Sequence, residues 1–327
     1  MSKKWDIAYR QFYLLTETTA HPFIRAASYN GMGCVAVLEG NNEQGIMWFQ
    51  RSLAASPSFH DAAYNLTLTY YHARRYEEAV KTGEKLSAVR DSDLELLLLL
   101  FHCYAKLGHK EKAHQAIRQA EKEAEIPSDW QQIARGYEQL SMFGEAARCY
   151  RRLLPEMRKE AWVWHGLAWS LWQEGQHESA LSHFKYALTL SRDEPEFACS
   201  YAWVLLRQGN WERSWRIFEQ VEQRHGHPLA IAGLIESAFR QGWLGRIKPL
   251  CDKLVKDKNR KIQALGHYYT GRWFMSRGEQ EEAQRHFSLS QQCGTVPESY
   301  LYSGLLHYHA QEHTQAYDRW RAILPVQ

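Results

Sequence analysis

Residues Glu160–Pro195 have the sequence EAWVWHGLAWSLWQEGQHESALSHFKYALTLSRDEP. Their apolar spacing predicts two amphipathic helices, from about Ala161 to Glu174 and from about His177 to Leu190, with a break at Gly175. Small residues let the two helices approach closely, and large residues fill the remaining space. The expected packing residues are Trp164, Leu167, Ala168 and Leu171 in the first helix and Ala180, Phe184, Ala187 and Leu188 in the second. Because neither helix can bury its apolar face alone, the hairpin requires neighbours of the same kind.

The same hairpin pattern recurs along almost the whole chain, about nine times at a spacing of about 34 residues. Upstream, Trp130, Ala134 and Tyr137 precede Ala146 and Tyr150. Further copies of the pattern include Tyr29, Leu66, Leu97, Tyr201, Thr270 and Tyr300 in their first helices. A tandem array of this length predicts an all-α solenoid, in which stacked hairpins bury one continuous core.

This spacing resembles the tetratricopeptide repeat family, whose pattern is W-x2-L-G-x2-Y, then A-x3-F, then P. The resemblance covers roughly residues 26–327, and the family implies a right-handed superhelix of helical hairpins with a concave groove that binds proteins or peptides. Residues 1–25 then contain an N-terminal capping helix, from about residue 3 to residue 19 with Ile7, Ala8, Phe12 and Leu15 on its apolar face. The expected single solenoid has units 26–59, 60–93, 94–126, 127–160, 161–194, 195–227, 228–261, 264–296 and 297–327.

The unit at 228–261 is the irregular one. Ile247 stands where a small residue is expected, and Pro249 follows it. Because proline removes a hydrogen bond from a helix interior, we expect this helix to start late, near Lys248, or to be kinked. The charged link Lys256–Lys261 is predicted to be longer than the others and to form a flexible joint.

Composition excludes several classes of function. The net charge of +3 is small for a nucleic-acid-binding protein, although the basic stretch Arg246–Lys261 could contact RNA, DNA or anionic lipid. The N-terminus shows no signal-peptide pattern, and the apolar run Leu96–Phe101 is too short to span a membrane. We therefore expect a cytoplasmic protein that does not insert into a membrane.

No motif predicts catalysis, a metal or a cofactor. The sequence contains no GxSxG, glycine-rich phosphate loop or HExxH pattern. The six cysteines are spread about one per repeat without a CxxC, which is typical of small core residues. The closest histidines, His307, His309 and His313, have no Cys or acidic partner at ligand spacing. We expect a non-enzymatic protein without a cofactor.

The thirteen tryptophans offer the best candidate site. In the family, the first helix of each hairpin lines the groove, and aromatic residues with arginines are typical of binding hot spots. The predicted groove residues are Trp162, His165, Trp169, Trp172, Trp203, Arg207, Arg135, Gln131, Glu138, Arg240, Tyr268 and Arg272. The alternative is that neighbouring hairpins bury these rings, since tryptophan is highly buried on average.

These observations favour a protein-binding adaptor, scaffold or chaperone that holds a peptide or helix of a partner in its groove. By analogy the form resembles bacterial repeat proteins that assist secretion, pilus or envelope assembly. The alternatives are a peptide-sensing regulatory module with its hinge at Pro249, and an RNA-binding helical repeat. The apolar C-terminal hairpin, which includes Tyr300, Leu301 and Trp320, also predicts self-association.

Overall fold

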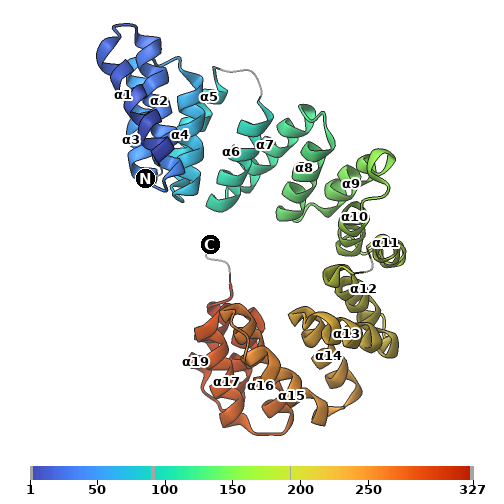
Figure 1. The fold of residues 1–327 in the computed structure, drawn as a ribbon. Coiled ribbons are helices and arrows are strands. Elements are labelled where there is room, and N and C mark those ends of the chain that lie inside the picture. The colour runs from blue at the N-terminus through green and yellow to red at the C-terminus, as the bar shows by residue number, and fades with distance from the viewer. Residues whose placement is uncertain (1–2, 90–92, 192, 325–327) are drawn as a thin grey trace. The chain divides into compact units, whose positions relative to one another are not determined.

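The computed structural model describes residues 3–89, 93–191 and 193–324, and all regular elements in these ranges are helices (Figure 1). Helix α1 (Lys3–Thr18) is followed by helical hairpins. The first helices of the hairpins are α2 (Pro22–Leu38), α4 (His60–His72), α6 (Leu94–Leu107), α8 (Pro127–Gln139), α10 (Ala161–Gln173), α12 (Pro195–Arg207), α14 (Pro228–Gln241), α16 (Arg260–Ser276) and α18 (Pro297–His309). The second helices are α3 (Asn42–Ala55), α5 (Tyr76–Ser87), α7 (Lys110–Lys122), α9 (Phe143–Met157), α11 (His177–Leu190), α13 (Trp211–His225), α15 (Leu244–Val255), α17 (Gln280–Cys293) and α19 (His313–Arg321).

A residue with positive φ marks the turn inside every described hairpin. These residues are Gly40, Arg74, Gly108, Ser141, Gly175, Gly209, Gly242, Gly278 and Gln311. Successive members lie 33 to 36 residues apart (for example 141 − 108 = 33 and 278 − 242 = 36). Glycine adopts this left-handed conformation without steric cost, so the turn glycines set the period of the chain. The structure confirms the all-α repeat fold predicted from the sequence.

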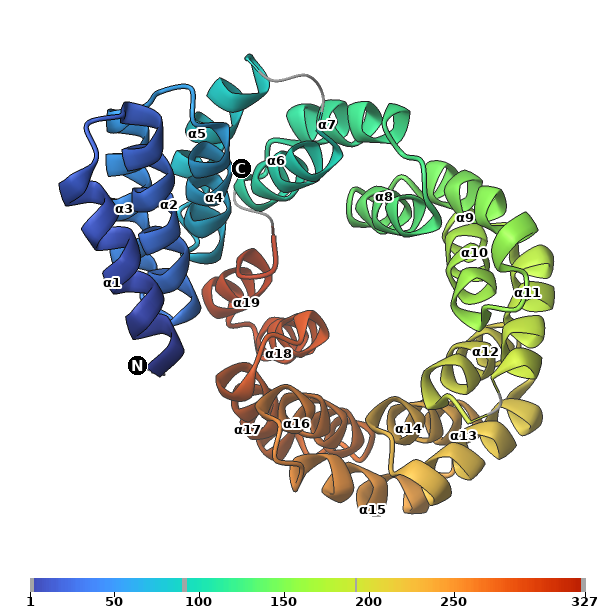
Figure 2. The same ribbon diagram turned by 45° about the horizontal axis from the view of Figure 1, so that its top comes forward.

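The chain divides into two compact units. Unit 1 comprises residues 1–158 and 166–176, and unit 2 comprises residues 159–165 and 177–327. Figure 2 shows the helix pairs of each unit from a second direction. The division runs through α10. Residues 161–165 of this helix belong to unit 2, and residues 166–173 belong to unit 1. The expectation of one continuous solenoid therefore stays a prediction.

Close approach within the hairpins depends on rings that lie against glycines. In unit 1 a Cβ atom added to Gly33 would lie 2.5 Å from the ring of Phe49. In unit 2 a Cβ atom on Gly271 would lie 2.6 Å from the ring of Phe287. Both phenylalanines are fully buried. The helices of these hairpins can pack at this distance only because the first helix has no side chain at the point of contact.

A buried serine fastens the second helix to the first in two hairpins. Ser52 Oγ donates to the carbonyl oxygen of Ala26 at 2.7 Å, and Ser290 Oγ donates to that of Ala264 at 2.7 Å. Both serines are fully buried. A buried hydroxyl that finds a partner avoids the cost of an unsatisfied polar group, so these positions hold hairpins 1 and 8 in register.

Helix α1 has almost the predicted bounds, and its predicted apolar face was right in part. Ile7 and Leu15 are exposed, with 59% and 44% of their surfaces accessible, so their assignment to the contact face was wrong. The predicted Phe12 does pack, against Gly31 of α2. Tyr9, which was not predicted to pack, also contacts the rest of the unit, with its ring 6.2 Å from that of Trp48.

The bounds of α10 and α11 confirm the two helices predicted in the central stretch, whereas the core role of Trp164 was wrong. Val163 is fully buried, and Trp164 is only partly buried. The Trp164 ring packs edge-on against Tyr186 at 4.6 Å and lies 5.4 Å from His183. The smaller valine takes the buried position, and the indole lies at its edge.

The irregular unit differs from the prediction in two respects. Helix α15 begins at Leu244, not near Lys248, and Pro249 lies inside it. The proline occupies the second turn, where it removes one helical hydrogen bond without preventing the helix from starting earlier. The link to α16 comprises residues 256–259, the same length as the link 56–59, and Asn259 caps α16 through a bond from the Lys261 amide at 2.9 Å. The predicted longer joint was therefore wrong.

Substitution of the turn glycine Gly108 should cost more than substitution of Gly245, a helical glycine with no neighbouring side chain. Gly108 has φ of +75°, so Gly108→Ala is expected to destabilise the protein by about 1–2 kcal/mol. Gly245 lies in the first turn of α15 with open space around its Cβ position, so Gly245→Ala should be neutral or stabilising by up to about 1 kcal/mol. Chemical unfolding followed by circular dichroism measures both, and equal effects would contradict the role assigned to the turns.

Candidate functional site

The predicted groove residues lie on the first helices and occupy equivalent positions. Arg135, Trp169, Trp203 and Arg272 each stand six residues before the positive-φ turn residue of their hairpin (141 − 135, 175 − 169, 209 − 203 and 278 − 272). Glu236 stands at the same position before Gly242. Because the hairpins repeat at this spacing, residues at one position face the same side of each first helix within a unit.

In unit 1 the site consists of an exposed arginine and an exposed tryptophan beside partly buried polar groups. Arg135 of α8 is exposed and makes no ion pair with the described residues, and Trp169 of α10 is 42% exposed. Gln131 and Glu138 are half-buried, and burial raises the pKa of the Glu138 carboxyl. Ser170 Oγ donates to Glu138 at 3.4 Å, which links α8 to α10.

The remaining members of the predicted aromatic strip are partly buried. Trp162 and Trp172 are half-buried in α10. Trp203 of α12 is half-buried and packs edge-on against Phe218 at 5.4 Å, so much of this ring belongs to the core of unit 2. Burial of these three rings supports the alternative stated from the sequence, and Trp169 remains the exposed member of the strip.

His165 provides a neutral aromatic surface, not a charge. Its ring stacks on Phe197 at 4.7 Å, and its Nε2 atom lies 2.9 Å from Ser200 Oγ. Burial lowers the pKa of His165 to about 4, so the imidazole is uncharged near pH 7. This histidine therefore joins α10 to α12 within unit 2 through stacking and a hydrogen bond.

Two predicted groove residues of unit 2 are engaged by the protein itself. Tyr268 is 6% exposed. The guanidinium of Arg272 forms an ion pair with Glu236, and its Cζ atom lies 4.5 Å from the centre of the Phe239 ring and 5.7 Å from that of Tyr302. Since the charge and the faces of this group are already in contact with other side chains, assigning Tyr268 and Arg272 to a free binding surface was wrong.

Exposed cations do occur on neighbouring first helices of unit 2. Arg207 ends α12 and Arg240 lies in the last turn of α14, and both are exposed without an ion pair to any described residue. Their predicted role in partner binding stays a prediction. Glu236 was not predicted, although the matching repeat positions of Glu236 and Arg272 could have indicated an ion pair between successive hairpins.

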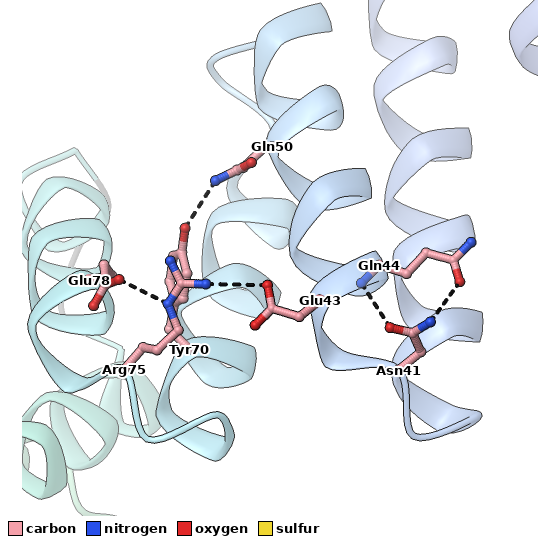
Figure 3. A network of polar contacts seen from close by, with 7 residues as sticks. All are labelled: Asn41, Glu43, Gln44, Gln50, Tyr70, Arg75 and Glu78. Carbon is pink, nitrogen blue, oxygen red and sulfur yellow. Dashed lines mark hydrogen bonds and ion pairs between the residues drawn. The ribbon is translucent and has the colours of Figure 1, made fainter.

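Polar contacts between hairpins 1 and 2 were not predicted from the sequence. Figure 3 shows Arg75, whose Nε donates to Glu78 at 2.9 Å and whose Nη1 reaches Glu43 at 3.4 Å. The same guanidinium lies 4.8 Å over the Tyr70 ring, and the Tyr70 hydroxyl accepts a bond from Gln50 at 3.0 Å. This network joins hairpins 1 and 2 through pairs of side chains that are 20 and 32 residues apart in sequence.

The cysteines and the metal-ligating side chains of the described residues do not form a second candidate site. Cys103, Cys149, Cys199 and Cys251 are buried, and burial raises the pKa of each thiol to about 12. Among the described residues, no group of three His, Cys, Asp or Glu side chains could hold a metal ion. Within the same ranges, none of the helices combines the length and the apolar character that crossing a membrane would require.

Comparison with known proteins supports the repeat fold. Residues 31–92 and 165–225 match the family model described as a tetratricopeptide repeat. No protein with a curated description matches the sequence. A tetratricopeptide repeat protein from Parabacteroides merdae is similar in structure, with 14% identity and a TM-score of 0.54 over 89% of this chain and 98% of that chain.

Two further solved structures share the fold at low identity. A monomeric mutant of IFIT1 with Gppp-AAAA has 14% identity and a TM-score of 0.53 over 100% of this chain and 75% of that chain. The Cut9–Hcn1 hetero-tetramer of APC/C has 14% identity and a TM-score of 0.51, with 98% and 81% covered. The chain is thus an all-α protein of repeated helical hairpins. Two of its segments are similar to tetratricopeptide repeats.

Removing the acid of the buried pair tests the assignment of Arg272. Glu236→Ala leaves a largely buried guanidinium without its counter-ion, and we expect unit 2 to lose about 2–3 kcal/mol of stability. Asp252→Ala removes the acid of the exposed pair with Lys248 and should cost at most about 0.5 kcal/mol. Urea unfolding compares the two variants. Equal losses would show that Arg272 is solvated and available for binding.

Proposed function

We propose that this protein is a non-catalytic scaffold that holds a peptide or helix of another protein against its first helices. The observation that carries the proposal is the exposure of Trp169 with Arg135 at the equivalent position of the preceding first helix. Tryptophan and arginine dominate binding hot spots, and an indole with 42% of its surface accessible has apolar area still to bury.

Exposed arginines on the first helices of each unit favour a partner segment that carries acidic groups. Arg135 in unit 1 and Arg207 and Arg240 in unit 2 are exposed and form no ion pair with the described residues. Each guanidinium can donate two parallel hydrogen bonds to a carboxylate, whereas Trp169 supplies apolar contact area. Arg272 and Tyr268 are not part of the proposed surface.

The finer roles stay predictions. An adaptor, a scaffold and a chaperone would use the same surface, and a place in a bacterial secretion, pilus or envelope machine stays a prediction from analogy. Self-association also stays a prediction, and it is supported by Leu301, Tyr308 and Tyr317 of the last hairpin, which are 43%, 51% and 61% exposed. Sedimentation at increasing protein concentration tests it, and a monomer at every concentration would contradict it.

An RNA-binding role is the second candidate. It is supported by the likeness in fold to IFIT1 with Gppp-AAAA, whereas the net charge of +3 supplies little general attraction for phosphates. Binding of a single-stranded oligonucleotide with a steep dependence on salt would favour RNA. Absence of binding at low salt would favour the protein scaffold.

The scaffold proposal predicts a specific effect of Trp169→Ala. We expect the affinity for a partner isolated with the wild-type protein to fall at least about thirtyfold, because a hot-spot tryptophan contributes about 2 kcal/mol or more. The matched control is Trp211→Ala, which removes a ring of similar exposure, 40%, from the second helix α13.

The measurement is affinity by titration with both variants confirmed as folded by circular dichroism. Loss of binding in Trp169→Ala alone supports the first-helix surface. Unchanged binding in Trp169→Ala, or an equal loss in Trp211→Ala, would remove Trp169 from the site.

A further inference from the structure

A cationic cavity lies in unit 1, away from the residues proposed above. It has a volume of about 550 Å³ and is formed by α7, α8 and α9, which follow one another in Figure 2. Its charged lining residues are Arg118 and Lys122 of α7, Arg148 and Arg152 of α9, and the single acid Glu121. Four cations therefore face one carboxylate in this cavity.

The single acid is already neutralised by its own contacts. Glu121 accepts a bond from Arg148 Nη2 at 3.0 Å and one from the Tyr137 hydroxyl at 2.6 Å. The hydrogen bond from Arg148 is the main cause that holds the pKa of Glu121 below its usual range. Arg118, Lys122 and Arg152 then remain without an ion pair to any described residue. Three positive charges around the cavity are uncompensated.

One of the free cations is held in position by an aromatic ring. The Cζ atom of Arg152 lies 4.1 Å from the centre of the Trp130 ring, and Trp130 is only 6% exposed. Stacking fixes the plane of the guanidinium and leaves its N–H groups free at the edge. Because the side chain is ordered before a ligand arrives, an anion bound here avoids part of the entropy cost of binding.

The corresponding cavity of the preceding hairpin has no such surplus. It is formed by α5, α6 and α7, with a volume of about 340 Å³. Its charged lining residues are Glu84 and Lys112, which pair with each other at 2.9 Å, and Tyr104 donates to Glu84 at 2.7 Å. In both cavities the lining acid pairs with a cation and accepts a hydrogen bond from a tyrosine, whereas only the α7–α9 cavity of these two has three additional cations.

We propose that the α7–α9 cavity binds a phosphomonoester, carried by a phosphorylated side chain of a protein partner. A phosphomonoester has a charge of about −1.5 to −2 at neutral pH and three strong acceptor oxygens, which matches three free cations better than one carboxylate does. Guanidinium groups pair with phosphate oxygens in a two-bond geometry. The site shares no residue with the Trp169 surface, so it stands or fails independently of the scaffold proposal.

The cavity fits a phosphorylated side chain better than a nucleic acid. Single-stranded nucleic acids are bound by cations that follow the backbone and by exposed aromatic rings on which bases stack. The aromatic ring of this cavity, Trp130, is buried and already covered by Arg152. It offers no free face to a base, whereas the cations remain available to a single phosphoryl group.

The test uses the full chain, immobilised, and a degenerate peptide library centred on phosphoserine. Retention is compared with the same library centred on serine and on glutamate. We expect the wild-type protein to retain the phosphoserine library about tenfold more than either of the others. Arg118→Gln/Arg152→Gln should reduce this ratio to about one, and Arg118→Gln alone should reduce it in part without disturbing the Trp130 contact.

The matched control is Arg151→Gln, which removes the same charge from a neighbouring exposed residue of α9 that does not line the cavity. It should leave the ratio unchanged. A ratio of one in the wild type, an unchanged ratio in the double variant, or an equal loss in Arg151→Gln would overturn the proposal. So would equal retention of the glutamate library. Inorganic phosphate and a 5′-phosphorylated oligonucleotide are added as competitors. If either displaces the library at a lower concentration than free phosphopeptides do, the phosphoryl group that binds here is not that of a protein, and this part of the proposal is wrong.

Discussion

Rings that lie against glycines are the contact on which the rest of this structure depends. They occur within hairpins, where Phe49, Phe287 and Trp320 lie on Gly33, Gly271 and Gly304, and between hairpins, where Tyr150 and Phe218 lie on Gly166 and Gly233. Because glycine has no side chain, the ring of the neighbouring helix can occupy the space beside its Cα atom. Helices so closely packed hold their other side chains in fixed positions, because a core of native density does not deform gradually.

Fixed helices divide the surface into parts with different chemistry. On the first helices, some side chains are engaged in contacts between hairpins, as in the ion pair of Arg272 with Glu236. Others, such as Arg135 and Trp169, remain exposed. Beside the second helices, a tyrosine, an acid and a cation meet between successive hairpins. The α7–α9 cavity carries the same contact with added cations. A single repeated frame thus offers an apolar surface in one place and an anion site in another.

The repeat period could be predicted from the sequence because it depends on local properties, namely turn glycines and the spacing of apolar residues. The identity of the buried ring could not be predicted in the same way. Val163 and Trp164 are neighbours with similar hydrophobicity, and only the packing of adjacent helices decides which one is buried. The start of α15 was mispredicted because one lost hydrogen bond at Pro249 costs less than the helix gains from burying Ile247 and Cys251.

Helical spacing predicted which side chains point away from their own hairpin, but not which of them stay exposed. Arg135 and Trp169 are exposed, whereas Trp203 and Arg272, at the same repeat position, are largely covered. The binding role of the exposed residues stays a prediction. Helical spacing could not show that Arg272 is paired, since the partner Glu236 belongs to the preceding hairpin. Contacts between repeats depend on residues about 35 positions apart, and a motif that describes one repeat does not include them.

A double-mutant cycle at Gly271 and Phe287 tests whether the packing of the ring depends on the missing side chain of the glycine. Gly271→Ala places a Cβ atom against the buried ring and should destabilise unit 2 by about 1–3 kcal/mol. In the Phe287→Leu background the ring is absent, so the same alanine should cost less by about 1 kcal/mol or more. A free energy of unfolding that changes equally in both backgrounds would show that the ring and the glycine are independent, and the account of how these helices pack would be wrong.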